Sequence, residues 1–220
     1  MSINNTFRDV LKSGARVYGL SLDDNCLSRF ETYMDILSSW NRYTNLVSAR
    51  DMNRFVEYHL LDSLKVAPFV NFSNIATVMD YGSGAGLPGI PLALAFPSVK
   101  VTLVDSRSRR CLFLEEVLTK IPTLHAVVIR SRVEDLPVTC NNSFTLVITR
   151  GTAKLPEFFN VSSRFIPSGG MLVAIKGDAI ESELQDLYET VDSRFFNIST
   201  HVPEPFNNVR RGKVVIITHV

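Results

Sequence analysis

The chain has 220 residues, of which 45% are hydrophobic and 20% charged, and its formal net charge is +1. This composition is typical of a globular protein that can bury a sizeable core, and it excludes disordered and collagen-like chains. No uninterrupted apolar run approaches the roughly 18 residues that cross a membrane. Charged residues also interrupt the first segment, so we expect no signal peptide, no membrane association and a cytoplasmic protein.

Cysteines and histidines are few and scattered along the chain. The three cysteines are odd in number and far apart, which indicates free thiols in a reducing compartment. None of the four histidines has the spacing of a metal-ligand motif, so we predict no metal site. A net charge near zero does not exclude nucleic acid, because a local patch of basic residues can supply the phosphate contacts.

Before residue 72 the apolar residues recur with a helical period. Apolar positions predict amphipathic helices over 7–17 and 27–40. The segment Ser21-Leu22-Asp23-Asp24 is close to a capping box and is expected to open the second helix. We expect Asp51 to cap a third helix that ends before Pro68. Residues 1–72 are therefore predicted to form a helical N-terminal extension.

From residue 73 onward, short β-rich runs alternate with helical patterns. The predicted strands cover 75–81, 99–105, 124–129, 144–149 and 170–175, and a terminal hairpin-like pair covers 195–202 and 213–219. This alternation predicts an α/β fold in residues 73–220: a mostly parallel, seven-stranded sheet with helices on both faces. Ligands on such sheets bind outside the carboxyl ends of the strands, at the point where the strand order reverses.

A glycine cluster, Gly82-Ser83-Gly84-Ala85-Gly86, follows the first predicted strand. The glycines at 84, 86 and 89 match the dinucleotide-binding fingerprint, which alone is weak evidence and also fits a tight turn without a ligand. Asp80 immediately precedes the cluster and would repel a pyrophosphate, whereas it would attract the sulfonium and ammonium groups of S-adenosylmethionine. The loop therefore favours S-adenosylmethionine over a dinucleotide.

Asp105 ends the second predicted strand, 19 residues after Gly86. An acid at that place can accept hydrogen bonds from both hydroxyls of a ribose. The alternative is a solvated cap for the helix that follows. Acids at two successive strand ends, on either side of a glycine turn, favour adenosine binding more than either acid alone.

Several sequence blocks, taken together, carry a family resemblance. They are Asn45-Leu46-Val47-Ser48-Ala49-Arg50-Asp51, His59-Leu60-Leu61-Asp62-Ser63-Leu64, Asp80-Tyr81-Gly82-Ser83-Gly84-Ala85-Gly86-Leu87-Pro88-Gly89-Ile90-Pro91, Leu103-Val104-Asp105-Ser106, Ser131-Arg132-Val133-Glu134 and Thr149-Arg150. Over residues 45–150 the chain resembles the bacterial small-subunit ribosomal RNA guanine-N7 methyltransferases, also called glucose-inhibited division protein B. It departs from that pattern at Tyr81, where the family usually has Val, and at Gly151-Thr152, where the family has small apolar residues.

The resemblance implies an enzyme with a Rossmann-like core that transfers a methyl group from S-adenosylmethionine to N7 of a guanine in 16S ribosomal RNA. Its partner would be small-subunit ribosomal RNA or the assembling small subunit, and we expect a monomer. The cofactor-binding residues that we assign are Gly82, Ser83, Gly84, Gly86, Leu87, Asp105, Val133, Glu134 and Arg150. The alternatives are a methyltransferase acting on a small molecule or protein, a non-catalytic RNA-binding assembly factor, and a nicotinamide dehydrogenase, which Asp80 disfavours.

Candidate substrate contacts are basic residues near the strand ends. We assign His59, Arg107, Arg109, Arg132, Lys176, Arg210 and Arg211 as candidates for RNA binding. His59 shares a helix face with Asp62 and Ser63, and this face either borders the cleft or packs helix against sheet. Arg150 either binds the methionine carboxylate or an RNA phosphate, or forms a structural salt bridge. Guanine N7 carries a lone pair and no proton, so we assign no catalytic acid or base.

Overall fold

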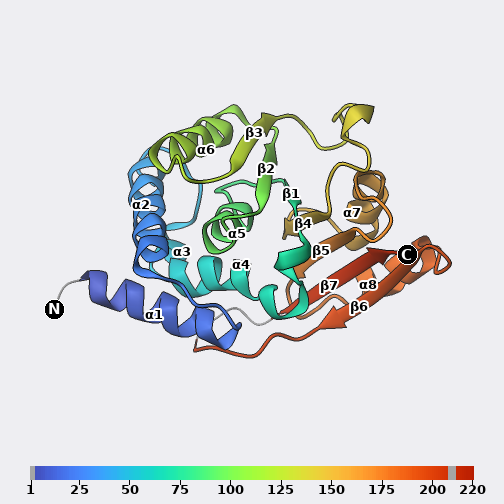
Figure 1. Ribbon diagram of the computed structural model, residues 1–220, viewed down its shortest axis with the longest axis horizontal. Helices are drawn as coiled ribbons and strands as arrows, with labels where there is room; N and C mark the ends of the chain where they lie inside the picture. Colours follow the sequence, from blue (N-terminus) through green and yellow to red (C-terminus); the bar gives the residue numbers. More distant parts are fainter. Residues whose placement is uncertain (1–2, 208–211) are drawn as a thin grey trace.

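The computed structural model describes residues 3–207 and 212–220, and it has a central sheet with helices on both faces (Figure 1). The strands are β1 (Thr77–Tyr81), β2 (Lys100–Asp105), β3 (Ala126–Arg130), β4 (Leu146–Arg150), β5 (Met171–Lys176), β6 (Phe196–His201) and β7 (Lys213–His219). They form one sheet in the order β3-β2-β1-β4-β5-β7-β6. Strands β1 to β5 pair in parallel, and β7 runs antiparallel to both β5 and β6. The predicted Rossmann-like α/β fold, with its terminal antiparallel pair, is confirmed.

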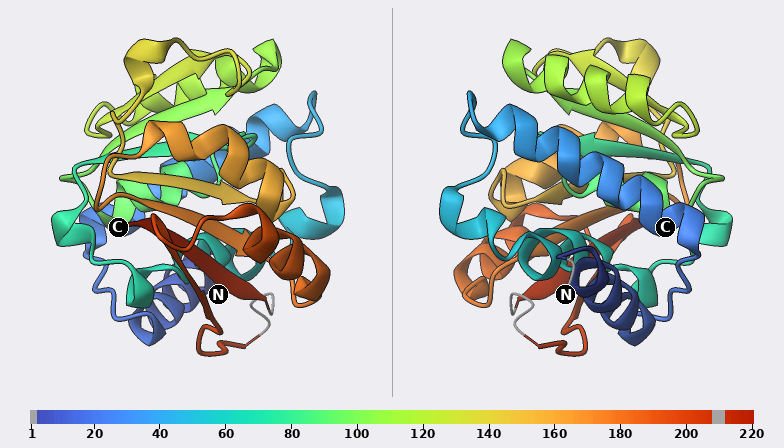
Figure 2. Two further views of the ribbon diagram at one scale, coloured as in Figure 1. Left: turned by 90° about the vertical axis from the view of Figure 1, so that its right-hand side faces the viewer. Right: turned by 90° about the vertical axis from the view of Figure 1, so that its left-hand side faces the viewer.

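Helices precede and connect these strands. They are α1 (Ile3–Val17), α2 (Asp24–Asn41), α3 (Ala49–Met52), η1 (Val56–Leu61), α4 (Asp62–Leu64), η2 (Ala67–Phe69), η3 (Phe72–Asn74), α5 (Gly89–Ala95), α6 (Ser108–Lys120), η4 (Val138–Cys140), α7 (Leu155–Ser162), η5 (Ser163–Phe165) and α8 (Glu181–Thr190). Figure 2 shows α1 and α2 on one side of the molecule, and α7 and α8 on the opposite side. In the described parts of the chain, no helix is long and apolar enough to cross a membrane.

Two predicted helix starts in the N-terminal extension were wrong. The cap of α2 is Asp23 rather than Ser21, because the Asp23 carboxylate accepts the backbone N–H of Cys26 at 2.7 Å. The cap of α3 is Ser48 rather than Asp51: the Ser48 hydroxyl accepts the Asp51 N–H at 3.1 Å. The predicted third helix is also divided, since a π-helical turn, η1, separates α3 from α4.

The core lies on both faces of the sheet, because successive strand residues point to opposite sides. Val78 and Leu103 belong to a buried cluster that they share with residues of α1, α2, α5 and α6. Their neighbours Met79 and Val104 belong to a second cluster, with residues of α7 and α8. The N-terminal extension therefore covers one face of the sheet and contributes to the same core. The division of the chain into two domains after residue 72 stays a prediction.

The strand order reverses between β1 and β4, which lie side by side in parallel at the centre of the sheet. Tyr81, the last residue of β1, is in register with Thr149 near the end of β4. The loop that follows β1 therefore emerges at the switch point, where ligands of this fold class bind.

Candidate active site

The glycine loop makes a tight turn directly after β1. Gly82, Gly84 and Gly86 have φ values of +72°, +58° and +84°, in the left-handed region that side chains disfavour. A Cβ atom at Gly82 would also lie 2.6 Å from Cγ2 of Thr152, so the segment after β4 lies against this loop. The backbone N–H of Ser83 donates to the carbonyl of Val104 at 3.0 Å, which fixes the loop to β2.

Asp80 lies beneath the glycine loop rather than at its mouth. The side chain is fully buried, and Oδ2 accepts the backbone N–H of Gly89 at 3.0 Å. Burial raises the pKa of Asp80 to about 7, against which the hydrogen bond from Gly89 acts. Asp80 therefore holds the start of α5 against the end of β1, and any effect of its charge on a ligand acts through the loop.

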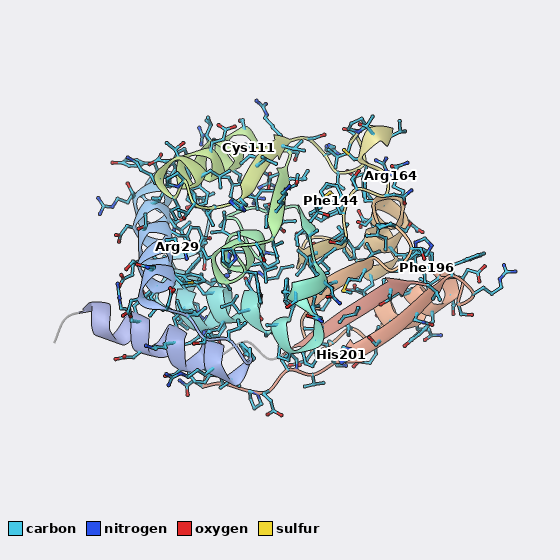
Figure 3. The ribbon with its side chains drawn as sticks, in the orientation of Figure 1. Arg29, Cys111, Phe144, Arg164, Phe196 and His201 are labelled. Atoms are coloured by element: carbon cyan, nitrogen blue, oxygen red, sulfur yellow. The ribbon has the colours of Figure 1, made fainter. Side chains whose placement is uncertain are left out.

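Asp105 joins the glycine loop to α6. It is only 4% exposed, and its Oδ2 accepts the N–H of Gly84 at 2.9 Å and Nη1 of Arg110 at 3.1 Å. Its Oδ1 accepts the N–H of Arg107 at 2.8 Å. Cys111, labelled in Figure 3, donates its thiol to the Asp105 carbonyl at 3.2 Å. A carboxylate has about four lone-pair sites, so Oδ1 can still accept a donor such as a ribose hydroxyl.

A first cavity of about 300 Å³ opens beside Asp105. Four of the predicted cofactor residues line it, namely Gly82, Asp105, Val133 and Glu134. The Tyr81 hydroxyl, also in the lining, donates to Oε1 of Glu134 at 3.2 Å. Arg164, labelled in Figure 3, donates to the carbonyl of Leu136 at 2.9 Å and to that of Glu134 at 3.3 Å. These contacts hold the turn after β3 at one wall of the cavity.

A second cavity of about 270 Å³ lies on the other side of the glycine loop. Ser83, Gly84 and Leu87 line it from the loop, and Arg150 lines it from the end of β4. The N-terminal extension supplies the opposite wall, which consists of Leu46, Val47, Ser48, Asp51 and His59. Gly82, Arg110 and Thr152 line both cavities, so the two adjoin across the glycine loop.

Arg150 anchors the extension to the sheet while it lines the second cavity. Its Nη1 contacts Oδ2 of Asp62 at 3.0 Å and the carbonyl of Tyr58 at 3.1 Å, and its Nη2 lies 2.6 Å from Nδ1 of His59. The other oxygen of Asp62 forms an ion pair at 2.6 Å with Lys65, and both side chains are nearly fully buried. The structural salt bridge therefore exists, and it places His59 at the cleft.

The remaining predicted residues fall in different places. Arg132 is exposed and lines the first cavity, whereas Gly86 only shapes the loop, since a Cβ atom there would lie 2.5 Å from Ile90. Lys176 is not in the lining of these two cavities, and its ammonium is paired with Glu183 at 2.7 Å. Arg107 and Arg109 line a third, adjoining cavity, whereas Arg210 and Arg211 lie outside the described residues.

Thr152 and Tyr33 are among the residues of this site that sequence reasoning missed. Thr152 covers Gly82, and its position just after a central strand was the signal that could have indicated it. Tyr33 reaches the glycine loop from α2, and nothing in the local sequence distinguishes it from an ordinary core residue. Within residues 3–207 and 212–220, no group of three or more His, Cys, Asp and Glu side chains is arranged to hold a metal ion.

Comparison with known proteins identifies similar sequences over most of the chain. A family model described as rRNA small subunit methyltransferase G matches residues 26–204. A ribosomal RNA small subunit methyltransferase G of Acetivibrio thermocellus is 30% identical, with 95% of this chain and 87% of that protein covered. The protein of the same name from Nitrosospira multiformis is 36% identical, with 82% and 84% covered.

Solved structures show similarity of fold alone. A branched-chain polyamine synthase from Thermus thermophilus, in complex with N4-aminopropylspermidine and 5′-methylthioadenosine, superimposes with a TM-score of 0.60 at 15% identity, covering 85% of this chain and 63% of that one. An rRNA methylase from Streptococcus thermophilus gives 0.51 at 17% identity, with 66% and 87% covered.

Proposed function

This chain belongs to the rRNA small subunit methyltransferase G family, and from that premise we propose that it transfers a methyl group from S-adenosylmethionine to N7 of a guanine in small-subunit ribosomal RNA. The observation that carries the proposal is the convergence of the glycine loop, Asp105 and the turn after β3 around one cavity at the switch point. We further propose that the reaction takes place in the cytoplasm, because small-subunit ribosomal RNA is the proposed substrate.

The first cavity fits the adenosine part of S-adenosylmethionine. Asp105 would bind the ribose through its remaining lone pair, Val133 would contact the adenine, and Glu134 would meet the adenine amino group. The methionine part would pass Gly82 towards the second cavity, where Arg150 lies.

The chemistry needs positioning more than proton transfer. When bound, S-adenosylmethionine supplies a methyl group on a positively charged sulfur. The N7 lone pair forms the new bond to the methyl carbon as the bond from carbon to sulfur breaks, which leaves a neutral thioether and a positive charge on the guanine. Since N7 loses no proton, no general base is required. The protein contributes by holding N7 about 3 Å from the methyl carbon, in line with the sulfur.

The substrate side of the site is the second cavity. The glycine loop lines this cavity on one side, and residues 46–48, Asp51 and His59 of the extension line it on the other. Specific recognition of RNA targets unpaired bases that can be turned out of a helix. We propose that the target guanine enters between the extension and the glycine loop, so that the extension selects the substrate.

Methyl transfer from labelled S-adenosylmethionine tests the proposal directly. Bare small-subunit ribosomal RNA, intact small subunits and free nucleosides serve as parallel substrates. We expect label in ribosomal RNA from one or both of the first two and none in nucleosides. Label only in nucleosides or in protein would support a methyltransferase of another substrate class, and RNA binding without any transfer would support an assembly factor.

A further inference from the structure

A third cavity of about 500 Å³ lies between the segment after α2 and the start of α6. We call it the arginine cavity, because Arg107, Arg109, Arg110 and Arg130 line it. Thr44, Asn45 and Leu46 form the wall from the extension, and Ser106 and Ser108 complete the lining. Side chains from three separate segments of the chain therefore converge on one space.

No carboxylate lies in the lining of the arginine cavity, although the chain as a whole has a net charge of only +1. Among the ion pairs of the described residues, Arg110 alone of the four arginines has a partner, which is Asp105. Arg107, Arg109 and Arg130 are exposed. These like charges give the cavity a positive potential, which favours an anion there.

The first turn of α6 adds to the positive potential. The residue before the helix, Arg107, makes no side-chain capping bond, and the first turn contains no acidic residue. The 13-residue helix therefore directs its positive end towards this cavity; the Asp105 carboxylate, which accepts the N–H of Arg107, offsets part of this potential but does not line the cavity. A guanidinium adds donors in a planar fork that matches two phosphate oxygens.

The arginine cavity adjoins the site already described. Arg110 lines all three cavities. Arg107 also lines the first cavity, and Leu46 also lines the second. A phosphate bound among the arginines would thus lie next to both the cofactor and the target base.

From these observations we propose that the arginine cavity binds a backbone phosphate of the RNA strand, next to the guanine that is methylated. This inference rests on the proposed function and names the part of the protein that positions its substrate. Phosphate contacts of this kind fix the register of a nucleic acid, while the reading of the base is left to another part of the site.

The test uses two double variants that remove equal charge. Arg109→Gln with Arg130→Gln alters two residues that line only the arginine cavity among the three cavities. Lys100→Gln with Lys120→Gln removes two exposed lysines elsewhere and is the matched control. Affinity for a single-stranded RNA oligonucleotide is measured by fluorescence anisotropy across a salt series, with S-adenosylhomocysteine saturating.

We expect the arginine double variant to bind RNA about tenfold more weakly at low salt than the control. The log–log salt slope should become shallower by about 0.7, the value for one phosphate contact in a single strand. Affinity for S-adenosylhomocysteine and the unfolding temperature should match those of the control. A variant with lysine at both positions should keep the salt slope of the wild type, because it retains both positive charges. Its affinity for RNA should be intermediate, because lysine lacks the planar pair of donors of a guanidinium.

Two results would overturn the inference. In the first, the arginine double variant binds RNA as the control does, with the same salt slope. In the second, inorganic phosphate titrated without RNA saturates a site that needs Arg109 and Arg130, while RNA affinity is unchanged, because the cavity would then serve a free anion. Failure of the proposed function is separately visible: the wild-type protein would then transfer no methyl group to ribosomal RNA, whatever the oligonucleotide measurement gives.

Discussion

The hydroxyl of Tyr33 on α2 donates a hydrogen bond to the carbonyl of Ala85 in the glycine loop, although the two residues lie 52 positions apart. Tyr33 is fully buried, and burial raises the pKa of its hydroxyl, which therefore keeps its proton and remains a donor. Through this contact the N-terminal extension holds the loop that we propose to bind the cofactor. The extension is thus part of the site as well as a cover for the sheet.

Tyr33→Phe should weaken both the fold and cofactor binding. The substitution leaves the buried carbonyl of Ala85 without this donor, which costs about 1–3 kcal/mol in the free energy of unfolding. Urea unfolding and calorimetry with S-adenosylhomocysteine measure the two effects. Tyr43→Phe is the control, since Tyr43 is 84% exposed. Equal stability and equal affinity in both variants would show that the hydrogen bond does not hold the loop.

Asp105→Ala should weaken cofactor binding by about 1.5–3 kcal/mol, the scale of lost hydrogen bonds to a charged group. The carboxylate accepts the N–H of Gly84 and lines the first cavity, so its loss removes a ribose acceptor and loosens the loop. Calorimetry with S-adenosylmethionine measures the change, and Asp186→Ala, at an exposed acid on α8, is the control. Unchanged affinity in a folded Asp105→Ala protein would exclude the ribose role.

Asp62→Asn should destabilise the protein by about 3–5 kcal/mol, because it leaves buried cations without their shared counter-charge. Asp62 pairs with Lys65 at 2.6 Å and with Arg150 at 3.0 Å, and its side chain is only 3% exposed. Asp192→Asn breaks the exposed pair with Arg194 and is expected to leave the free energy of unfolding unchanged. Urea unfolding measures the free energy of unfolding of both variants. Similar values for the two would contradict a stabilising role of the buried ion pairs of Asp62.

Asp80→Asn should remove a pH dependence of stability. Burial raises the pKa of Asp80 from its ordinary value of 3.8 to about 7, so between these values the folded protein keeps a proton that the unfolded chain releases. The stability due to this group is therefore fully present below pH 4 and is lost as pH rises through 7. As pH rises across this window, the free energy of unfolding of the wild type should therefore fall relative to that of the neutral variant, by about 4 kcal/mol in all.

Urea unfolding at several pH values between 4 and 8 measures that difference. Asp135→Asn, at an exposed acid, serves as the control and should show a constant difference from the wild type. A constant difference for Asp80→Asn as well would mean that the buried carboxyl does not titrate in this range.

The sequence was sufficient to predict the sheet and the edge of the sheet at which the candidate site lies. Strand and helix periods alternate clearly after residue 73, and the glycine cluster directly follows a strand. Parallel strands place their carboxyl ends at one edge, so Gly82, Asp105 and Val133 were expected together, and one cavity collects them. The local sequence pattern was enough to predict these features, because each residue lies just after a strand and the pattern shows where the strands end.

Contacts between segments that lie far apart in the sequence could not be predicted from the local sequence pattern. Asp80 has the same sequence signal whether it faces a ligand or lies under the loop, and only packing around α5 decides that it is buried. Arg150 was left open between a ligand and a salt bridge, because its partner Asp62 is 88 positions away. The helix starts were misplaced because Ser21 and Asp51 each have a competing capping residue nearby, Asp23 and Ser48.

Mapping of N7-methylguanine along small-subunit ribosomal RNA tests the central claim most directly. Ribosomal RNA from cells that lack this protein is incubated with S-adenosylmethionine and either the wild-type protein or the Asp105→Ala variant, and N7-methylated positions are located by chemical cleavage of the strand. We predict one new N7-methylguanine, formed by the wild-type protein and much more slowly by the variant. Methylation of another atom or of another kind of base would contradict the account. So would a lack of any methylation of ribosomal RNA from cells without this protein.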